Sequence, residues 1–322
     1  MKPGICVVTV TYGDRQELLR KVIEKLKQID IIERVIVVEN GSNYHLESDD
    51  YTKVIRNKAN LGSAKGFKQG IEAAIKLGMQ YIWLLDDDNV PQEGALSSLV
   101  RFHNTLEEKK EELFALVSLR EDRKDFVEAA ASGSYKGIFP KKNSFFGLHL
   151  VDLPKKLIKK VIKKEIDRKD LKQTTIPYSY YSGLFFKSSL IKTIGLPEER
   201  FFLYSDDFEF THRINANGGK LYLVPESRLV DIDQSWFVKT SFLKSLFNSS
   251  EDRRIYYSIR NRISFERNGL KYRGLVYLIN RFIFLSLVKV ISQLKGKKLR
   301  YLLIKKAIND GESNKLGKNN NI

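Results

Sequence analysis

Three consecutive aspartates, Asp86-Asp87-Asp88, follow an apolar run of strand length at residues 81–85. Carboxylates massed at the end of a buried strand repel one another and lose hydration unless a cation neutralises them. Hard oxygen ligands of this kind suit Mg²⁺ or Mn²⁺. An acidic turn is the alternative, because Asp and Asn readily bond to their own backbone in turns. The tripeptide therefore predicts either a cation site or a turn, and the elements around it have to decide between the two.

Those elements alternate between strand and helix. Apolar runs of strand length occur at residues 5–10, 34–38 and 81–85, and helical spacing of apolar residues occurs at 15–29 and 61–78. This alternation predicts an α/β fold with a mainly parallel sheet, in which ligands bind beyond the carboxyl ends of the strands. Polar residues stand at that position after each strand, namely Thr11 and Tyr12, residues 39–42, and the three aspartates.

The chain's length and composition fit a folded protein with a large core. It has 322 residues, of which 42% are hydrophobic, so a disordered or fibrous protein is excluded. Its one cysteine, Cys6, lies within a predicted buried strand and indicates a core thiol rather than a disulfide framework. The N-terminus shows no long apolar segment of a secretory signal, so we expect a cytosolic protein.

The positive charge is concentrated in two segments. Of a formal net charge of +17, residues 237–322 hold 19 Lys and Arg against 5 Asp and Glu, and residues 154–172 read as a lysine-rich amphipathic helix. Such surfaces bind anions, either nucleic acid or anionic lipid headgroups, although a solvated surface helix also explains residues 154–172. The apolar stretch 275–294 is interrupted by Asn280, Arg281 and Lys289. Because a charge at mid-membrane costs about 2.5–3.5 kcal/mol even on lenient scales, we expect an amphipathic helix on protein or lipid rather than a transmembrane span.

Five segments, in order, resemble family 2 glycosyltransferases with a GT-A fold, over roughly residues 5–236. Residues 7–12 with Arg15 look like the opening strand and loop of that family, and residues 37–42 like its second strand and acidic turn. Residues 60–70 resemble its glycine-rich helix start, the three aspartates its DXD motif, and residues 201–210 with Arg213 and Gly218 the segment of the catalytic base. The details at 62–67 and 84–91 look most like the galactofuranosyltransferase and rhamnosyltransferase branch.

The resemblance implies a role for each matched residue. Asp86 and Asp88 would hold Mn²⁺ or Mg²⁺ against the leaving diphosphate, and Asp87 would face the ribose or the sugar. The remaining candidates for substrate binding are Thr11, Tyr12, Arg15, Glu39, Asn60, Gly62, Lys65, Tyr181, Asp206 and Glu209. Several have structural alternatives: loop packing for Thr11 and Tyr12, a helix N-cap for Asn60, and core packing for Tyr181.

The same resemblance assigns the general base of an inverting transfer to Asp207. Its phenylalanine neighbours would desolvate the carboxylate and raise its pKa toward a useful range. An N-cap of the helix predicted at 208–215 is the alternative for Asp206-Asp207.

One position departs from the family pattern. Many relatives carry a metal-binding histidine after the strand that corresponds to residues 221–225, whereas this chain has Asp231 and Asp233 there. Asp231 is the expected third ligand, with Asp233 left open.

Together these features predict a GT-A catalytic domain over residues 1–236 and a basic, amphipathic helical region over 237–322. The implied activity is a metal-dependent, inverting hexosyltransferase of cell-surface polysaccharide synthesis. Its donor would be UDP-galactofuranose, or alternatively dTDP-rhamnose, and its acceptor a glycan or lipid-linked sugar. We expect a cytoplasmic protein, peripheral on the inner face of the cell membrane and not bound to nucleic acid, with a homo-oligomer left open. A nucleotide-binding or nucleic-acid-binding protein that uses the basic tail is the alternative class, although no RNA-binding motif is visible.

Overall fold

The computed structural model describes residues 4–152, 170–233, 246–247 and 251–319. The chain divides into two compact units, and the first comprises Met1–Tyr135, Lys169–Glu199 and Asp206–Gln234. The second comprises Lys136–Arg168, Arg200–Ser205 and Ser235–Ile322. The sequence predicted a domain boundary after residue 236. The structure instead groups residues 136–168 and 200–205 with the C-terminal helices. The helix expected at 154–172 lies almost wholly outside the described residues.

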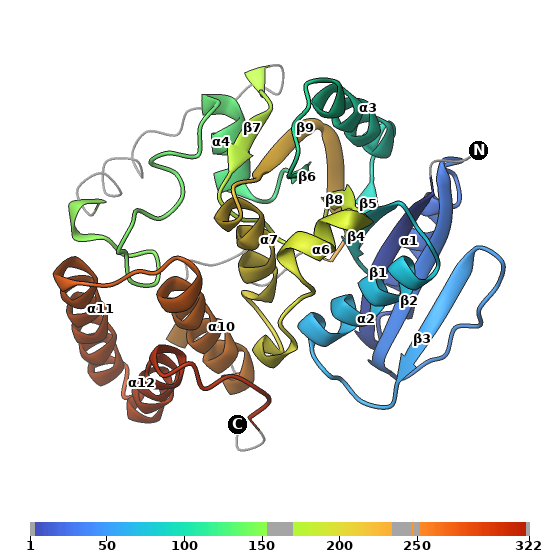
Figure 1. The fold of residues 1–322 in the computed structure, drawn as a ribbon. Coiled ribbons are helices and arrows are strands. Elements are labelled where there is room, and N and C mark those ends of the chain that lie inside the picture. Colours follow the sequence, from blue (N-terminus) through green and yellow to red (C-terminus); the bar gives the residue numbers. More distant parts are fainter. Residues whose placement is uncertain (1–3, 153–169, 234–245, 248–250, 320–322) are drawn as a thin grey trace. The chain divides into compact units, whose positions relative to one another are not determined.

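The first unit is built on a nine-stranded mixed sheet (Figure 1). Its path runs β3-β2-β1-β4-β8-β6-β9-β5, with β7 paired to β9. The first four strands on this path are mutually parallel, whereas β4 to β8, β6 to β8, and β5 to β9 are antiparallel pairs. The strands are β1 Ile5–Gly13, β2 Ile32–Ser42, β3 Thr52–Asn57, β4 Tyr81–Asp86, β5 Asn89–Pro91, β6 Phe114–Arg120, β7 Thr174–Ile176, β8 Leu184–Lys187 and β9 Lys220–Asp231.

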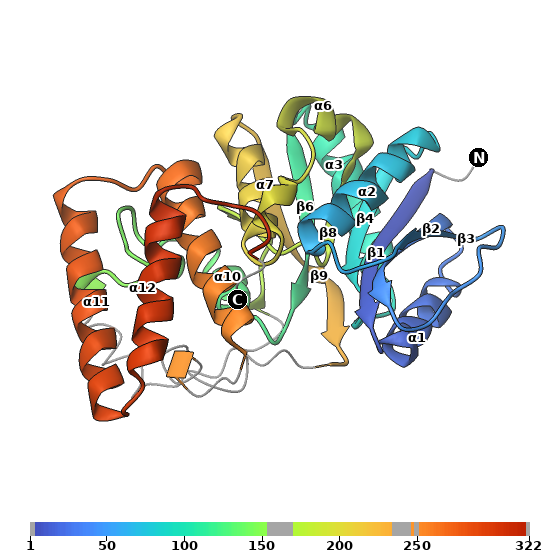
Figure 2. The ribbon, with the colours of Figure 1, turned by 90° about the horizontal axis from the view of Figure 1, so that it is seen from below.

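Helices cover both faces of this sheet, as Figure 2 shows for α1 and α2 on opposite sides of β1 and β2. They are α1 Gln16–Leu26, α2 Ser63–Lys76, α3 Ala95–Glu108, α4 Lys124–Ser132, α6 Ile191–Ile194 and α7 Asp206–Ala216, with short 3-10 turns η3 Ser188–Leu190 and η4 Glu199–Phe201. Because side chains alternate along a strand, Ile5 and Val7 of β1 pack in the core shared with α1, whereas Val8 and Val10 face α2. The α/β class and the predicted strands and helices of the N-terminal half are confirmed.

Register brings the strand ends together at one edge of the sheet. Thr11 of β1 lies opposite Glu39 of β2, and Val10 lies opposite Asp86 of β4. The polar residues that follow these strands therefore share one edge, as the parallel arrangement predicted.

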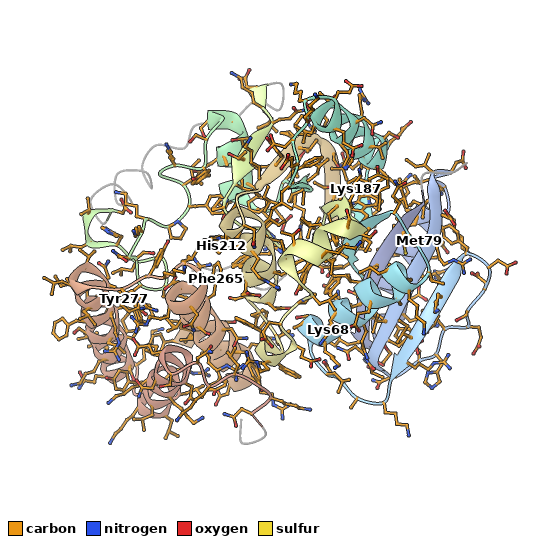
Figure 3. The ribbon with its side chains drawn as sticks, viewed as in Figure 1. Lys68, Met79, Lys187, His212, Phe265 and Tyr277 are labelled. Atoms are coloured by element: carbon orange, nitrogen blue, oxygen red, sulfur yellow. The ribbon has the colours of Figure 1, made fainter. Side chains whose placement is uncertain are left out.

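The second unit is helical. It contains η1 Leu150–Asp152, α10 Asp252–Ser264, the π-helical turn η5 Phe265–Gly269, α11 Leu275–Leu294 and α12 Lys298–Glu312. Its core combines Phe145 with residues of all three helices, including Tyr256, Tyr277 and Ile304. Tyr277 of this core is labelled in Figure 3. The helix predicted from the apolar stretch 275–294 is present with those bounds.

Candidate active site

The three aspartates form both a turn and an acidic cluster. Asp86 ends β4, Asp87 and Asp88 form the turn, and Asn89 begins β5. Strand β5 pairs antiparallel with β9, which places Asn89 opposite Asp231, and the backbone N–H of Ile232 donates to the carbonyl of Asp88 at 2.9 Å. The chain thus brings Asp231 beside a motif that lies far from it in sequence.

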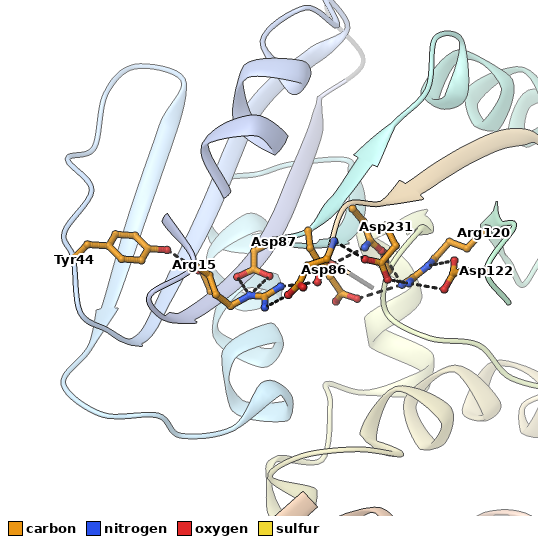
Figure 4. A network of polar contacts seen from close by, with 12 residues as sticks. Arg15, Tyr44, Asp86, Asp87, Arg120, Asp122 and Asp231 are labelled. Carbon is orange, nitrogen blue, oxygen red and sulfur yellow. Dashed lines mark hydrogen bonds and ion pairs between the residues drawn. The ribbon is translucent and has the colours of Figure 1, made fainter. Parts of the chain in front are cut away.

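Arg15 neutralises one side of this cluster (Figure 4). Its Nε donates to both carboxylate oxygens of Asp87 at 2.9 Å, and its two Nη atoms reach Asp88 at 2.5 Å and Asp233 at 2.6 Å. The guanidinium also lies 5.5 Å from the ring centroid of Tyr12. The side chain of Asp233 is therefore held by Arg15, while its backbone N–H donates to Asp231 Oδ1 at 3.0 Å.

Arg120, at the end of β6, neutralises the other side. Its Nη2 donates to Asp231 at 2.5 Å and to Asp122 at 3.0 Å, its Nη1 donates to the Asn89 side chain at 2.8 Å, and Asp86 lies 3.6 Å away. Only 3% of its side chain is exposed, so these carboxylates provide the counter-charge that a buried cation needs. Arg120 was not among the residues that the sequence motifs singled out. A lone arginine at the end of the apolar run 114–119 is the signal that would have found it.

The acidic cluster has more carboxylates than these arginines neutralise. Burial and the charges of Asp86, Asp231 and Asp87 raise the pKa of Asp88 to about 8, and burial raises the pKa of Asp87 to about 6 despite Arg15. Within the described part of the chain, no three Asp, Glu, His or Cys side chains already converge as metal ligands. The donor set is nevertheless all oxygen with excess negative charge, which fits Mg²⁺ or Mn²⁺. Asp86, Asp88 and Asp231 are the residues that would hold such an ion.

The residues expected around the nucleoside have distinct environments. Thr11 is buried and its hydroxyl lies 2.7 Å from that of Tyr44, whereas 43% of Tyr12 is exposed beside Arg15. Glu39 is buried, and its two oxygens accept hydrogen bonds from the Leu46 amide at 2.6 Å and from Arg56 at 2.8 Å. Glu39 therefore anchors the loop after β2, and Tyr12 is the accessible member of the three.

The glycine-rich segment leads into α2. Asn60 accepts the Gly62 amide at 2.8 Å, and Gly62, with φ 89°, is the residue that caps the helix. Asn60 thus forms a turn two residues before the N-cap position and is not itself the cap. Lys65 of α2 forms an ion pair with Glu199.

Asp206 and Asp207 occupy the first turn of α7 rather than the N-cap position. Asp206 is buried and accepts a hydrogen bond from the Ser63 hydroxyl at 2.9 Å. Asp207 is partly buried and accepts the Phe208 amide at 2.8 Å. Burial, followed by repulsion from Asp206, raises the pKa of Asp207 well above its ordinary value, as its apolar neighbours predicted. A carboxylate with a raised pKa is suited to accept a proton near neutral pH.

Glu209 and Tyr181, which were also expected to bind substrate, both contact other side chains of the protein. Glu209 pairs with Arg213 at 3.1 Å, one helical turn later. Tyr181 is buried, and its ring lies 4.4 Å from that of Phe67 and 5.8 Å from that of Phe210. Core packing, one of the two alternatives that the sequence left open for Tyr181, describes these contacts.

Comparison with known proteins finds that this chain is similar to glycosyltransferases. The family model "Glycosyl transferase family 2" matches residues 6–109. Galactofuranosyltransferase GlfT1 of Mycolicibacterium smegmatis is 24% identical over 224 residues, which cover 66% of this chain and 66% of the relative. GlfT1 of Mycobacterium tuberculosis is 24% identical over 227 residues, 68% of this chain and 66% of the relative. The match thus spans just under two thirds of the length of these curated relatives.

Two solved structures share the fold at low identity. The mannosyltransferase PcManGT from Pyrobaculum calidifontis, in complex with GDP-Man and Mn²⁺, aligns with a TM-score of 0.52 and 11% identity, over 96% of this chain and 87% of that one. GalNAc-T7 with UDP, GalNAc and Mn²⁺ aligns with a TM-score of 0.51 and 16% identity, over 86% of this chain and 54% of that one.

The sheet, its flanking helices and these neighbours define a GT-A fold. Within that fold, residues 6–109 match the family 2 glycosyltransferase model, and the chain is similar to galactofuranosyltransferases. The resemblance drawn from the motifs is confirmed.

Proposed function

We propose that this protein is an inverting, metal-dependent glycosyltransferase that transfers galactofuranose from UDP-galactofuranose to a glycan or lipid-linked acceptor of a cell-surface polysaccharide. The observation that carries the proposal is two separate sets of carboxylates, one at the ends of the strands and the other in the first turn of α7. One set is the arginine-paired cluster of Asp86, Asp88 and Asp231, and the other is Asp207 with its raised pKa. The similarity to galactofuranosyltransferases supports the choice of donor.

The two sets of carboxylates would have different roles in the reaction. A divalent cation held by Asp86, Asp88 and Asp231 would neutralise the charge that develops on the departing diphosphate. Asp207 would accept the proton of the acceptor hydroxyl as that oxygen bonds to the anomeric carbon from the face opposite the leaving group. The bond between the anomeric carbon and the diphosphate breaks with its electron pair leaving on UDP, so the configuration inverts.

A donor screen tests the proposed reaction. We expect UDP release from UDP-galactofuranose in the presence of Mn²⁺, with less release of dTDP from dTDP-rhamnose under the same conditions. The anomeric configuration of the product, read by NMR coupling constants, would be opposite to that of the donor. Faster turnover of dTDP-rhamnose would identify dTDP-rhamnose as the donor instead. Retention of the anomeric configuration would reject the inverting mechanism.

The role of the aspartate cluster has its own test. Replacing Asp88 with Asn removes a charge at the proposed metal site, so titration of Mn²⁺ with UDP by calorimetry should show at least a tenfold loss of metal-dependent affinity. The exposed carboxylate of Asp50 in the same unit provides a matched control, and Asp50→Asn should bind normally. Unchanged affinity and metal dependence in a folded Asp88→Asn protein would reject the assignment.

We also propose that the second unit holds the enzyme at the cytoplasmic face of an anionic membrane. Helix α11 is long and apolar enough by length and composition to cross a membrane, and only 28% of its most apolar window is buried within the described protein. Its polar residues, however, have partners within the unit, since Asn280 donates to the Asn143 carbonyl at 2.9 Å and Arg281 pairs with Glu312 at 2.8 Å. These contacts favour a helix that packs on its own unit and exposes one apolar face, and they argue against a span.

A further inference from the structure

Residues 201–205, the approach segment, lead directly into α7 and have an unusual backbone. Phe202, Tyr204 and Ser205 have φ angles of 66°, 68° and 59°. Residues with a side chain rarely adopt this left-handed region, because Cβ approaches the following carbonyl oxygen. Three such residues within four positions persist only where surrounding contacts fix them, and backbone of this kind is concentrated at functional sites.

Asn261 of α10 supplies those contacts. Its side chain is fully buried, and its amide nitrogen donates to the carbonyls of Phe201 at 2.7 Å, Leu203 at 2.5 Å and Tyr204 at 3.0 Å. The neighbouring Arg260 donates through Nε to the Asn261 side-chain oxygen at 2.8 Å, so the amide nitrogen is the atom that faces the three carbonyls. One buried amide thus binds three carbonyls of the approach segment.

Further contacts of the second unit hold the same residues. Arg260 also donates to the Phe201 carbonyl at 3.2 Å and to the Gly317 carbonyl at 2.6 Å, while the Gly317 amide donates to the Arg200 carbonyl at 2.6 Å. The ring of Phe202 lies 5.0 Å from that of Tyr257. The approach segment is therefore held from α10 and from the chain after α12.

We propose that Asn261 is a positioning residue for the catalytic carboxylate. Ser205 is joined by its peptide bond to Asp206, the first residue of α7, and Asp207 comes next. The backbone that Asn261 fixes is therefore joined by two peptide bonds to the proposed base. The proposal rests on the proposed function, because it requires Asp207 to be the general base. It gives the second unit a role in catalysis that is separate from membrane attachment.

The test compares two buried asparagines of the second unit. Asn261→Ala removes the amide that binds the approach segment. Asn280→Ala removes a buried amide of α11 that bonds to Leu150 and Asn143 instead. Both variants should lose thermal stability. Only Asn261→Ala should also lower kcat with UDP-galactofuranose, by about ten- to a hundredfold, because small misplacements of a catalytic group are costly. Calorimetric affinity for UDP with Mn²⁺ should stay within about twofold in both variants.

A rescue experiment separates positioning from general destabilisation. Glycine adopts positive φ without a steric penalty, so Ser205→Gly reduces the dependence of the approach segment on Asn261. We expect the double variant Asn261→Ala, Ser205→Gly to regain part of the lost kcat. Equal loss of kcat in Asn261→Ala and Asn280→Ala, or no loss in either, would overturn the proposal. If Asn261→Ala does not fold, kcat is measured for Asn261→Ser instead. A normal kcat in Asn261→Ser would also overturn the proposal.

The proposed function fails by a different result. If Asp207→Asn retains kcat, the assignment of the base is wrong. If Asp207→Asn loses kcat while Asn261→Ala retains it, only the positioning role is rejected.

Discussion

Asp206 and Asp207 are adjacent carboxylates with different surroundings. Asp206 is only 2% exposed and bonds to Ser63 of α2, so it ties two helices together. Asp207 is more accessible and is held by the amide of its own neighbour, Phe208. The accessible carboxylate is the one that an acceptor hydroxyl can reach, which favours Asp207 as the base and Asp206 as a structural residue.

This difference predicts the effect of two neutralising substitutions. Asp207→Asn keeps the shape and removes the proton acceptor, so kcat should fall by about 10²–10⁴, the usual contribution of general-base catalysis. Affinity for UDP with Mn²⁺ should persist, because the metal aspartates are unchanged. Asp206→Asn should have a milder effect on kcat. The reverse order of severity would shift the assignment of the base by one residue.

Asp207 also predicts a pH-dependent change in stability. Its pKa is raised in the folded state, so the folded protein binds the proton more tightly than the unfolded chain does, and stability falls as pH rises through the raised pKa. Asp207→Asn escapes this loss. It should be more stable than wild type above that pKa, with the difference shrinking as pH falls toward about 4.

Chemical denaturation of both proteins across this pH range measures the difference. Asp50→Asn, which alters an exposed carboxylate, should show little change. A gain for Asp207→Asn that grows on acidification would contradict the raised pKa.

At the scale of elements, the site depends on close packing of α2 against β1. An added Cβ at Gly70 would lie 2.2 Å from a methyl carbon of Val8, and one at Gly66 would lie 2.6 Å from Val10. Both glycines therefore allow the helix to approach strand β1, which contains Thr11 and Tyr12. The sequence identified Gly66 as part of a helix start, but the strand that packs against it became visible only in the structure.

Gly70→Ala tests this packing. Helix propensity alone favours alanine by about 1 kcal/mol. The clash with Val8 should outweigh that gain, since overpacking a core typically costs about 1–3 kcal/mol. We expect a lower free energy of unfolding by chemical denaturation. The double variant Gly70→Ala, Val8→Ala should have a higher free energy of unfolding than the sum of the two single changes predicts. A Gly70→Ala protein more stable than wild type would show that the helix can move away at little cost.

Features that depend on residues close together in the sequence were predictable, whereas contacts between residues far apart in the sequence were not. The order of strands and helices and the shared edge of Thr11, Glu39 and Asp86 depend on local periodicity and on the geometry of parallel sheets, so they were predictable. The pairing of Arg120 with Asp231 depends on the path of β6 and β9, and no local pattern shows it. The bonds from Asn261 to residues about 60 positions earlier were unpredictable for the same reason.

At the scale of the whole molecule, basic charge and exposed apolar side chains occur on the same helical region. In α11, 56% of Leu278 and 71% of Phe282 are exposed, and Lys and Arg residues precede, interrupt and follow the helix. Apolar side chains that enter the headgroup region and basic residues that attract anionic lipid would stabilise binding together. Polar partners for Asn280 and Arg281 within the unit are consistent with a helix that lies along the surface.

The double variant Leu278→Glu, Phe282→Glu tests this attachment in the full chain. Both side chains are already exposed, so folding should be preserved, whereas two acids on the apolar face should weaken binding to phosphatidylcholine–phosphatidylglycerol vesicles at least tenfold. Ile75→Glu, a comparable change at a 39%-exposed position of α2, should bind like wild type in the same sedimentation assay. Peripheral binding should also weaken in about 1 M salt, where the Debye length falls to about 3 Å. Membrane binding that survives both high salt and alkaline extraction would instead indicate that α11 spans the membrane. Retention of the protein on nucleic acid, with no binding to vesicles, would indicate that the basic surface binds nucleic acid.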